Sequence, residues 1–227
     1  MKKVLPIIAC ALTLLTPVVS SAHEPGERCT TNVNYSRVWR VDDTIRTGRC
    51  DDVINVGGIV LESVLHTGRG SDRIRVNELL RSTVMAGMGA DTISVETTAY
   101  DTDIVTGNGF DTVIIGGDVT RLNLNTGARA DRVYIGGRQY EGNLLTGAGN
   151  DTLEIIGVNF VRGVIDMGAG QDVLMLGGAS SEYQVAYEDG SYKINDVHTT
   201  TVFNVETIIF ADGTVMQEGV LIQPSEP

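Results

Sequence analysis

The sequence is poor in aromatic residues, in cysteine and histidine, and in positive charge, and each shortage excludes a class of protein. Phe, Trp and Tyr make up 5% of the 227 residues, too few for one large globular core. Three cysteines and three scattered histidines supply no repeated nitrogen or sulfur ligands, and no His-Glu-x-x-His zinc motif occurs. Lysine and arginine total 17 against 29 acidic residues, a balance that disfavours nucleic acid or an anionic membrane surface as partner and favours cations.

The first 22 residues are typical of a bacterial Sec-type signal peptide. Lys2 and Lys3 precede an apolar run that ends at Val19, and the small residues Ser20-Ser21-Ala22 provide a cleavage site. We therefore expect a secreted or periplasmic protein with no membrane span in the mature chain. Cleavage would remove Cys10 and leave Cys29 and Cys50, which we predict to form a disulfide; two free thiols are the alternative.

Glycine is abundant, and a six-residue turn motif accounts for much of it. The motif reads x-Gly-x-Gly-x-Asp with small variations, and its first glycines are spaced 20, 19, 20, 20, 20 and 21 residues apart. Seven copies in one phase identify a repeat architecture. The copies are Thr47-Gly48-Arg49-Cys50-Asp51-Asp52, Thr67-Gly68-Arg69-Gly70-Ser71-Asp72, Ala86-Gly87-Met88-Gly89-Ala90-Asp91, Thr106-Gly107-Asn108-Gly109-Phe110-Asp111, Thr126-Gly127-Ala128-Arg129-Ala130-Asp131, Thr146-Gly147-Ala148-Gly149-Asn150-Asp151 and Met167-Gly168-Ala169-Gly170-Gln171-Asp172.

Fixed aliphatic positions flank every copy of the motif. The second and fourth residues after each Asp are always Val, Ile or Leu, whereas the residue between them varies from Asn55 to Arg75 to Glu154. Constant aliphatic residues at every second position predict a β-strand whose aliphatic face is buried. A third fixed aliphatic, such as Ile45 or Leu65, lies three residues before each first glycine and marks a second short strand.

Two short strands and two turns in twenty residues predict one flattened coil, which must stack on its neighbours to bury its apolar face. The fold class that we expect is all-β: a parallel β-roll or β-solenoid of about seven 20-residue coils with a small C-terminal β cap. The predicted segments are a signal peptide at 1–22, an N-terminal cap at 23–46, the repeats at 47–178, and a cap and tail at 179–227. Within the tail, Glu188-Asp189-Gly190-Ser191 predicts a hairpin.

Stacking would place the seven motif aspartates in one column. Carboxylates about 5 Å apart repel by roughly 3 kcal/mol per adjacent pair at an effective dielectric constant of 20. Glycines beside each Asp leave backbone carbonyls exposed, so the turn offers only oxygen ligands. Flexible oxygen coordination favours Ca²⁺ over Mg²⁺ or a transition metal.

The x-Gly-x-Gly-x-Asp-x-aliphatic-x pattern resembles the repeats-in-toxin (haemolysin-type) calcium-binding repeat over residues 47–178. That resemblance implies a β-roll whose successive loops hold Ca²⁺ between them. The segment from Tyr183 to Val215 is similar to the β-structured region that often closes such arrays. Two features depart from the family pattern: the opening Gly-Gly is replaced by Thr, Ala or Met before one glycine, and only one turn of each coil carries the motif.

The predicted metal ligands come from the turns with both glycines intact, and ions are expected between Asp72 and Asp91, Asp91 and Asp111, and Asp151 and Asp172. The turns of Asp52 and Asp131 are expected to bind more weakly, because Cys50 and Arg129 replace the second glycine. Arg129 is expected to place its guanidinium near the column in place of an ion. The full set is Asp72, Asp91, Asp111, Asp151, Asp172, Gly68, Gly70, Gly87, Gly89, Gly107, Gly109, Gly147, Gly149, Gly168 and Gly170.

Several alternatives remain open at this stage. Each Asp could shape its corner merely by bonding backbone amides. The opening threonines suggest an ice-binding or adhesin surface, although they share parity with buried residues and should point inward. A carbohydrate-binding module or a small polysaccharide lyase is also compatible with a solenoid, and polysaccharide or another cell-surface component is then the partner. No nucleophile elbow, phosphate loop or clustered catalytic acid is present, so we expect no enzyme.

Overall fold

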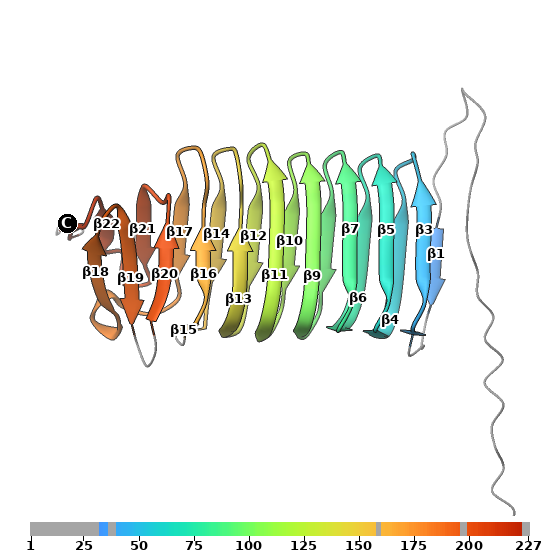
Figure 1. Ribbon diagram of the computed structural model, residues 1–227, viewed down its shortest axis with the longest axis horizontal. Helices are drawn as coiled ribbons and strands as arrows, with labels where there is room; N and C mark the ends of the chain where they lie inside the picture. Colours follow the sequence, from blue (N-terminus) through green and yellow to red (C-terminus); the bar gives the residue numbers. More distant parts are fainter. Residues whose placement is uncertain (1–31, 36–39, 158–159, 196–198, 224–227) are drawn as a thin grey trace, which may run out of the picture.

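The computed structural model describes residues 32–35, 40–157, 160–195 and 199–223, and these form a parallel β-solenoid (Figure 1). About seven turns stack into a rod, each strand pairing with the strand about 20 residues later in the chain. This confirms the predicted fold class. The predicted signal peptide and Cys29 lie outside the described residues.

One ladder contains the strand that follows each motif aspartate. Its neighbours are parallel and in register, so that Ile54 lies beside Ile74, and Ile74 beside Ile93. The register repeats at every coil because the same two positions are aliphatic in each copy. The members are β1 (Asn32–Tyr35), β4 (Val53–Leu61), β6 (Arg73–Leu80), β8 (Thr92–Val95), β10 (Thr112–Ile115), β12 (Arg132–Ile135), β14 (Thr152–Ile155), β17 (Val173–Leu176) and β21 (Thr207–Phe210).

A second ladder contains the strand that leads into each motif turn, and it faces the first across the core. Its members are β3 (Thr44–Gly48), β5 (Val64–Arg69), β7 (Thr83–Met88), β9 (Ala99–Asn108), β11 (Val119–Ala128), β13 (Gln139–Leu145), β16 (Val164–Asp166) and β20 (Thr199–Phe203).

A third, shorter ladder was not predicted. β2 (Arg40–Val41) pairs with the end of β4, which pairs with the end of β6, and the beginnings of β9, β11 and β13 continue the series to β15 (Phe160–Val161). Each coil therefore has three strand segments rather than two. The inward residue of this ladder ranges from Val60 and Leu79 through Ala99 to Gln139, so no constant aliphatic position marked it in the sequence.

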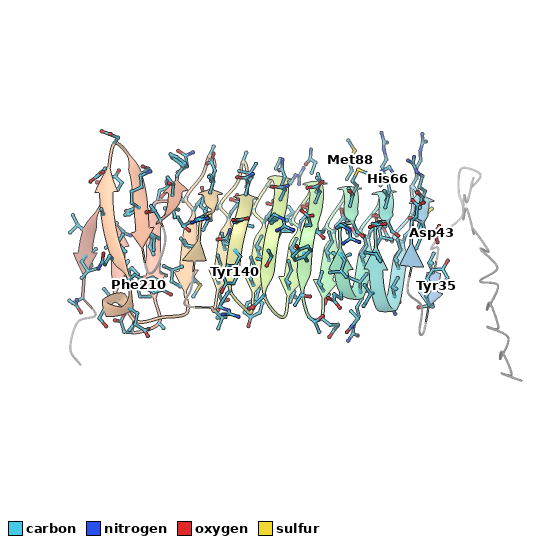
Figure 2. All side chains as sticks on the ribbon, turned by 60° about the horizontal axis from the view of Figure 1, so that its bottom comes forward. Tyr35, Asp43, His66, Met88, Tyr140 and Phe210 are labelled. Carbon is cyan, nitrogen blue, oxygen red and sulfur yellow. The ribbon has the colours of Figure 1, made fainter. Side chains whose placement is uncertain are left out.

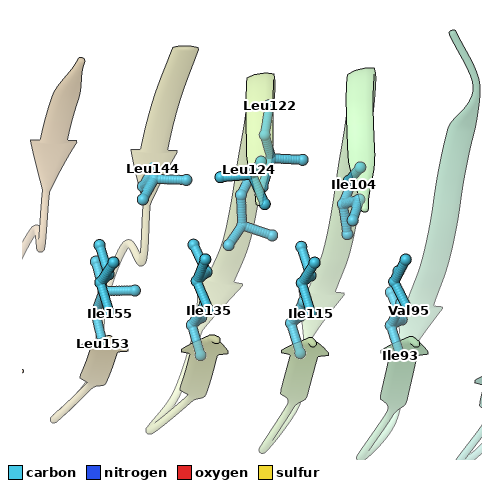
Figure 3. Close-up of a cluster of buried hydrophobic side chains, with 14 of the residues drawn as sticks. Ile93, Val95, Ile104, Ile115, Leu122, Leu124, Ile135, Leu144, Leu153 and Ile155 are labelled. Carbon is cyan, nitrogen blue, oxygen red and sulfur yellow. The ribbon is translucent and has the colours of Figure 1, made fainter. Parts of the chain in front are cut away.

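The predicted inward aliphatic residues form the core. All of them are at most 3% exposed, and the ladders point them toward one another, as Ile93, Ile104 and Leu124 show (Figure 3). The core is thus a set of stacked Val, Ile and Leu rows that runs the length of the rod. Each row removes apolar surface from water only when the next coil is in place, which makes neighbouring coils mutually stabilising.

The corner between the third and second ladders depends on one left-handed residue per coil. All seven have φ between 44° and 54°, and none is glycine. Their side chains alternate in charge along part of the column, and adjacent coils are linked by the ion pairs Arg81–Glu62 (2.5 Å) and Arg121–Asp101 (3.2 Å). The seven residues are Asp42, Glu62, Arg81, Asp101, Arg121, Glu141 and Arg162.

The C-terminal segment covers the last coil with antiparallel strands. β18 (Gln184–Glu188) and β19 (Ser191–Asn195) form the predicted hairpin, with Asp189 and Gly190 at positive φ, and β19 pairs with β20. β22 (Val215–Gln217) pairs with β21, and β23 (Val220–Ile222) pairs with β22. A 3₁₀ turn, η1 (Ser180–Glu182), leads into this cap. Both long ladders therefore end on antiparallel strands, which protects edges that would otherwise invite aggregation.

Candidate metal centre

The motif turns stack so closely that their glycines are required by backbone contact alone. A Cβ on Gly87 would collide with the carbonyl oxygen of Gly68, and a Cβ on Gly89 would collide with that of Gly70. Gly87 also has a φ of 118°, in the region that side chains rarely adopt. The first glycine of a coil therefore allows the turn of the preceding coil to approach, whatever the turn binds.

The seven motif aspartates form a buried column at the inner side of these turns. Each is at most 3% exposed. One oxygen of every carboxylate after Asp52 accepts a hydrogen bond from the backbone amide of the aspartate in the preceding coil, as in Asp72 N–H to Asp91 Oδ1 (2.8 Å) and Asp91 N–H to Asp111 Oδ1 (2.8 Å). The same bond recurs between Asp52 and Asp72, Asp111 and Asp131, Asp131 and Asp151, and Asp151 and Asp172. The corner-shaping interpretation is thus correct for one oxygen of each of these six carboxylates.

The other oxygen of each carboxylate is the notable feature of the column. Among the described residues, Oδ2 of Asp72, Asp91, Asp111, Asp131, Asp151 and Asp172 is buried and accepts no hydrogen bond. A buried acceptor without a donor is costly, and a buried unpaired charge is costlier still. Six such atoms in one row identify a place where a cation or a proton must be supplied.

The cost of burying these carboxylates as anions also raises their pKa values. Burial is the main cause that raises the pKa of Asp91 and of Asp131 to about 7, and that of Asp72 and of Asp172 to about 6. Repulsion from neighbouring aspartates adds to the effect, while the amide hydrogen bonds oppose it. Asp72, Asp91, Asp131 and Asp172 thus take up a proton between about pH 6 and 7 unless another positive charge is close.

The opening threonines line the interior beside the column and are at most 5% exposed, as their parity predicted. Thr67 lies near enough to Asp72 to lower its pKa, yet its single proton is directed to the Ala86 carbonyl at 3.1 Å. Thr126 likewise donates to the Thr146 carbonyl at 2.9 Å. These hydroxyls therefore bind main-chain carbonyls of the next coil, and the opening threonines do not form an exposed array that could contact ice.

In two turns the second glycine of the motif is replaced, by Cys50 and by Arg129. The expectation that Arg129 neutralises the column is wrong, because its side chain is exposed and its guanidinium lies over the ring of Phe110, 5.3 Å from the ring centre. Arg129 itself is held at a φ of 86°, where glycine is favoured. Asp52 and Asp131 are as buried as the other aspartates, and the amide of each donates to the next carboxylate of the column, so the replaced glycines do not disturb their place in it.

The structure adds one acidic residue that sequence reasoning missed. Glu206 follows β20 through a turn of only three residues, and its Oε2 accepts the Asp172 amide at 2.6 Å. It thus occupies the aspartate position of a further coil. The alternation of Val202 and Ile208 around it matches the repeat, but the glycine motif that would have identified it is absent.

The residues fit a hard cation better than any other group. Neighbouring Oδ2 atoms from Asp72 to Asp172 are buried and accept no hydrogen bond from the part of the chain that the structure describes, and backbone carbonyls would be the other oxygen ligands of the turn. No cluster of three or more His, Cys, Asp and Glu side chains occurs in the part of the chain that the structure describes, which limits the side-chain donors of any one site. A site here would combine a pair of aspartates with main-chain oxygens.

Two further expectations concern residues near the ends of the chain. Cys50 is buried, and its predicted partner Cys29 is outside the described residues, so their pairing stays a prediction. No helix among the described residues is long and apolar enough to cross a membrane.

No protein-family model matches the sequence, and no curated protein matches it. Among solved structures, the chain is similar to a hyperactive, Ca²⁺-dependent, β-helical antifreeze protein from an Antarctic bacterium, with 17% identity and a TM-score of 0.28, over 90% of this chain and 97% of that one. Similarity at this level supports no conclusion about the function of this chain.

Proposed function

We propose that the protein is an exported calcium-binding structural module whose solenoid becomes fully stable when Ca²⁺ neutralises the aspartate column. The observation that carries this proposal is the row of six buried Oδ2 atoms with no hydrogen-bond donor among the described residues. The ions would lie between adjacent aspartates, with the pairs Asp72 and Asp91, Asp91 and Asp111, and Asp151 and Asp172 as the first candidates. Calcium would supply positive charge without requiring the carboxylates to be protonated.

Metal binding and folding would be linked, because the paired carboxylates exist only when two coils are stacked. A chain carrying a signal peptide would cross the membrane unfolded and complete its fold outside the cytoplasm, where calcium is abundant. An affinity in the range of extracellular modules, about 10⁻⁴ to 10⁻³ M, would match that setting. A Cys29–Cys50 disulfide would then join the first described coil to the segment before it. No catalytic role is part of this proposal.

Calorimetry on the mature chain tests the metal, with CaCl₂ and MgCl₂ titrated separately after removal of bound ions. We expect heat and a gain in thermal stability with Ca²⁺ and a much smaller response to Mg²⁺, whose octahedral shell adapts poorly to an irregular set of carbonyls. Circular dichroism with and without chelator tests the linkage. Absence of Ca²⁺ uptake at millimolar concentration, with an unchanged melting temperature, would refute the proposal.

A further inference from the structure

The arginines of this acidic protein are distributed unevenly. Arg75, Arg81, Arg121 and Arg138 each pair with a carboxylate of a neighbouring coil. Of the exposed arginines that form no ion pair or side-chain hydrogen bond with any described residue, four lie in or beside the first two motif turns: Arg46, Arg49, Arg69 and Arg73. We call these four the arginine edge.

Strand register brings Arg49 and Arg69 together at the motif turns, while Arg46 lies just before its turn on β3 and Arg73 lies just after its turn on β6. Arg46 pairs with His66, and Gly48 pairs with Gly68, so Arg49 and Arg69 follow equivalent glycines in adjacent coils. Adjacent coils are about 4.8 Å apart at the backbone. The positions that continue this row are Met88, Asn108, Ala128, Ala148 and Ala169, none of them charged. Figure 2 labels Met88 and His66, which lie near the edge of the rod that the motif turns form.

One negative group lies within the arginine edge. Asp51 is exposed, and its Oδ1 accepts the Ser71 amide at 2.7 Å. At these turns the Arg49 and Arg69 guanidinium groups outnumber the Asp51 carboxylate, which leaves a locally positive surface on a chain of net charge −12. Arg49 and Arg69 occupy equivalent positions in neighbouring coils and repel each other, and an anion lying across both would relieve this repulsion.

We propose that the arginine edge binds a linear anionic glycan, a chain carrying carboxylate or sulfate groups on successive sugars. Guanidinium groups bind such oxyanions through paired hydrogen bonds. The spacing of the coils is close to the length of one sugar unit, so a chain laid along the rod meets Arg49 and Arg69 with consecutive charges. The acidic remainder of the rod repels a nucleic acid duplex or an anionic bilayer, which brings charge over a wider area. The proposal does not depend on where calcium binds.

Binding is tested on the mature chain at one fixed calcium concentration, with polygalacturonate and dextran sulfate as charged glycans and dextran as the neutral one. The double variant R49A/R69A removes two charges from the arginine edge, and R132A/R162A removes two exposed, unpaired arginines elsewhere. Arg162 has φ 52°, but alanine there adds no strain because both residues carry a Cβ. Circular dichroism confirms that both variants are folded.

We expect binding to a charged glycan that weakens with salt, no binding to dextran, a loss of about tenfold or more in R49A/R69A, and less than about twofold in R132A/R162A. Three results would overturn the proposal: no binding by the wild-type chain, an equal loss in both double variants, or binding that persists in R49A/R69A. The last would mean that calcium bridges the glycan to the acidic side chains. Binding to phosphatidylglycerol vesicles without binding to either charged glycan would also overturn it.

Discussion

The backbone amide of Asp172 donates to the carboxylate of Glu206 at 2.6 Å, so a glutamate ends a column that seven aspartates build. The turn before Glu206 is three residues shorter than the motif turn, since Asp166 pairs with Phe203 and Val173 with Thr207. The extra methylene of glutamate allows its carboxylate to reach the amide from this shortened turn. The last repeat thereby keeps the same hydrogen bond as every internal one.

Replacing Glu206 tests that role. In Glu206→Ala the Asp172 amide loses its acceptor, and we expect a loss of about 1–3 kcal/mol in the free energy of unfolding. Glu206→Gln retains an acceptor oxygen and should lose less than half as much. Glu154, on the outward face of β14, provides the control Glu154→Ala, which should change stability by less than about 0.5 kcal/mol. Urea denaturation measures all three, and equal losses in the alanine and glutamine variants would contradict the hydrogen-bond explanation.

The stability of the calcium-free protein should fall as pH rises. Burial raises the pKa of Asp72, Asp91, Asp131 and Asp172 to about 6 or 7 in the folded chain, above the ordinary value of 3.8. The folded state therefore binds more protons than the unfolded state between these values, and the stability gained below the ordinary pKa is lost as pH rises through 6 to 7. At about 1.4 kcal/mol per unit of pKa shift, one such carboxylate contributes about 3–4 kcal/mol.

Denaturation midpoints in chelator from pH 4.5 to pH 8 check this dependence. Saturating Ca²⁺ should abolish most of it, because the ion replaces the protons. A midpoint in chelator that rises toward pH 8 would show that the column is not the dominant titrating group.

Substitutions of Asp91 can separate hydrogen bonding from metal binding in the column. Its Oδ1 accepts a hydrogen bond from the Asp72 amide, and its Oδ2 accepts none from the described residues. In chelator at pH 8, Asp91→Asn should be more stable than wild type, because it keeps the acceptor and removes a buried charge. In Ca²⁺ it should be less stable and bind the metal more weakly. Asp91→Ala also leaves the Asp72 amide without its acceptor and should lose about 1–3 kcal/mol in either condition.

The exposed neighbour Asp51 supplies a charge-matched control. Asn at position 51 keeps the oxygen that accepts the Ser71 amide, so Asp51→Asn should change neither stability nor calcium affinity by more than a small amount. Calorimetric titration together with chelator melts distinguishes the variants. If Asp51→Asn weakened calcium binding as much as Asp91→Asn, the effect would reflect net charge and not the column.

Gly107 and Gly190 both have positive φ but differ in their surroundings. A Cβ at position 107 would meet the carbonyl oxygen of Gly87, whereas a Cβ at position 190 would have no atom within 4 Å. We expect Gly107→Ala to lose about 3 kcal/mol or more, and Gly190→Ala to lose about 1 kcal/mol from backbone strain alone. Thermal melts in Ca²⁺ measure the pair. Similar losses at the two positions would show that the turns can move apart to accommodate a methyl group.

The sequence by itself determined the period, the buried face of two of the three ladders, and the single column of aspartates. These follow from local chemistry, because a strand alternates its side chains and a repeat places equivalent residues above one another. Ile54, Ile74 and Ile93 could be placed in the core in this way, and the hairpin at Asp189 could be placed from its turn residues.

Only the tertiary structure decided what depends on contacts between residues 20 or more positions apart. It showed the third ladder, whose inward residues vary from Val60 to Gln139, and it placed Glu206 at the end of the column without a glycine motif. It turned Arg129 outward over Phe110. Finally, it divided each motif carboxylate from Asp72 to Asp172 into an oxygen bound by the amide of the preceding coil and an oxygen without a donor among the described residues, because the hydrogen bond forms only when two coils are stacked.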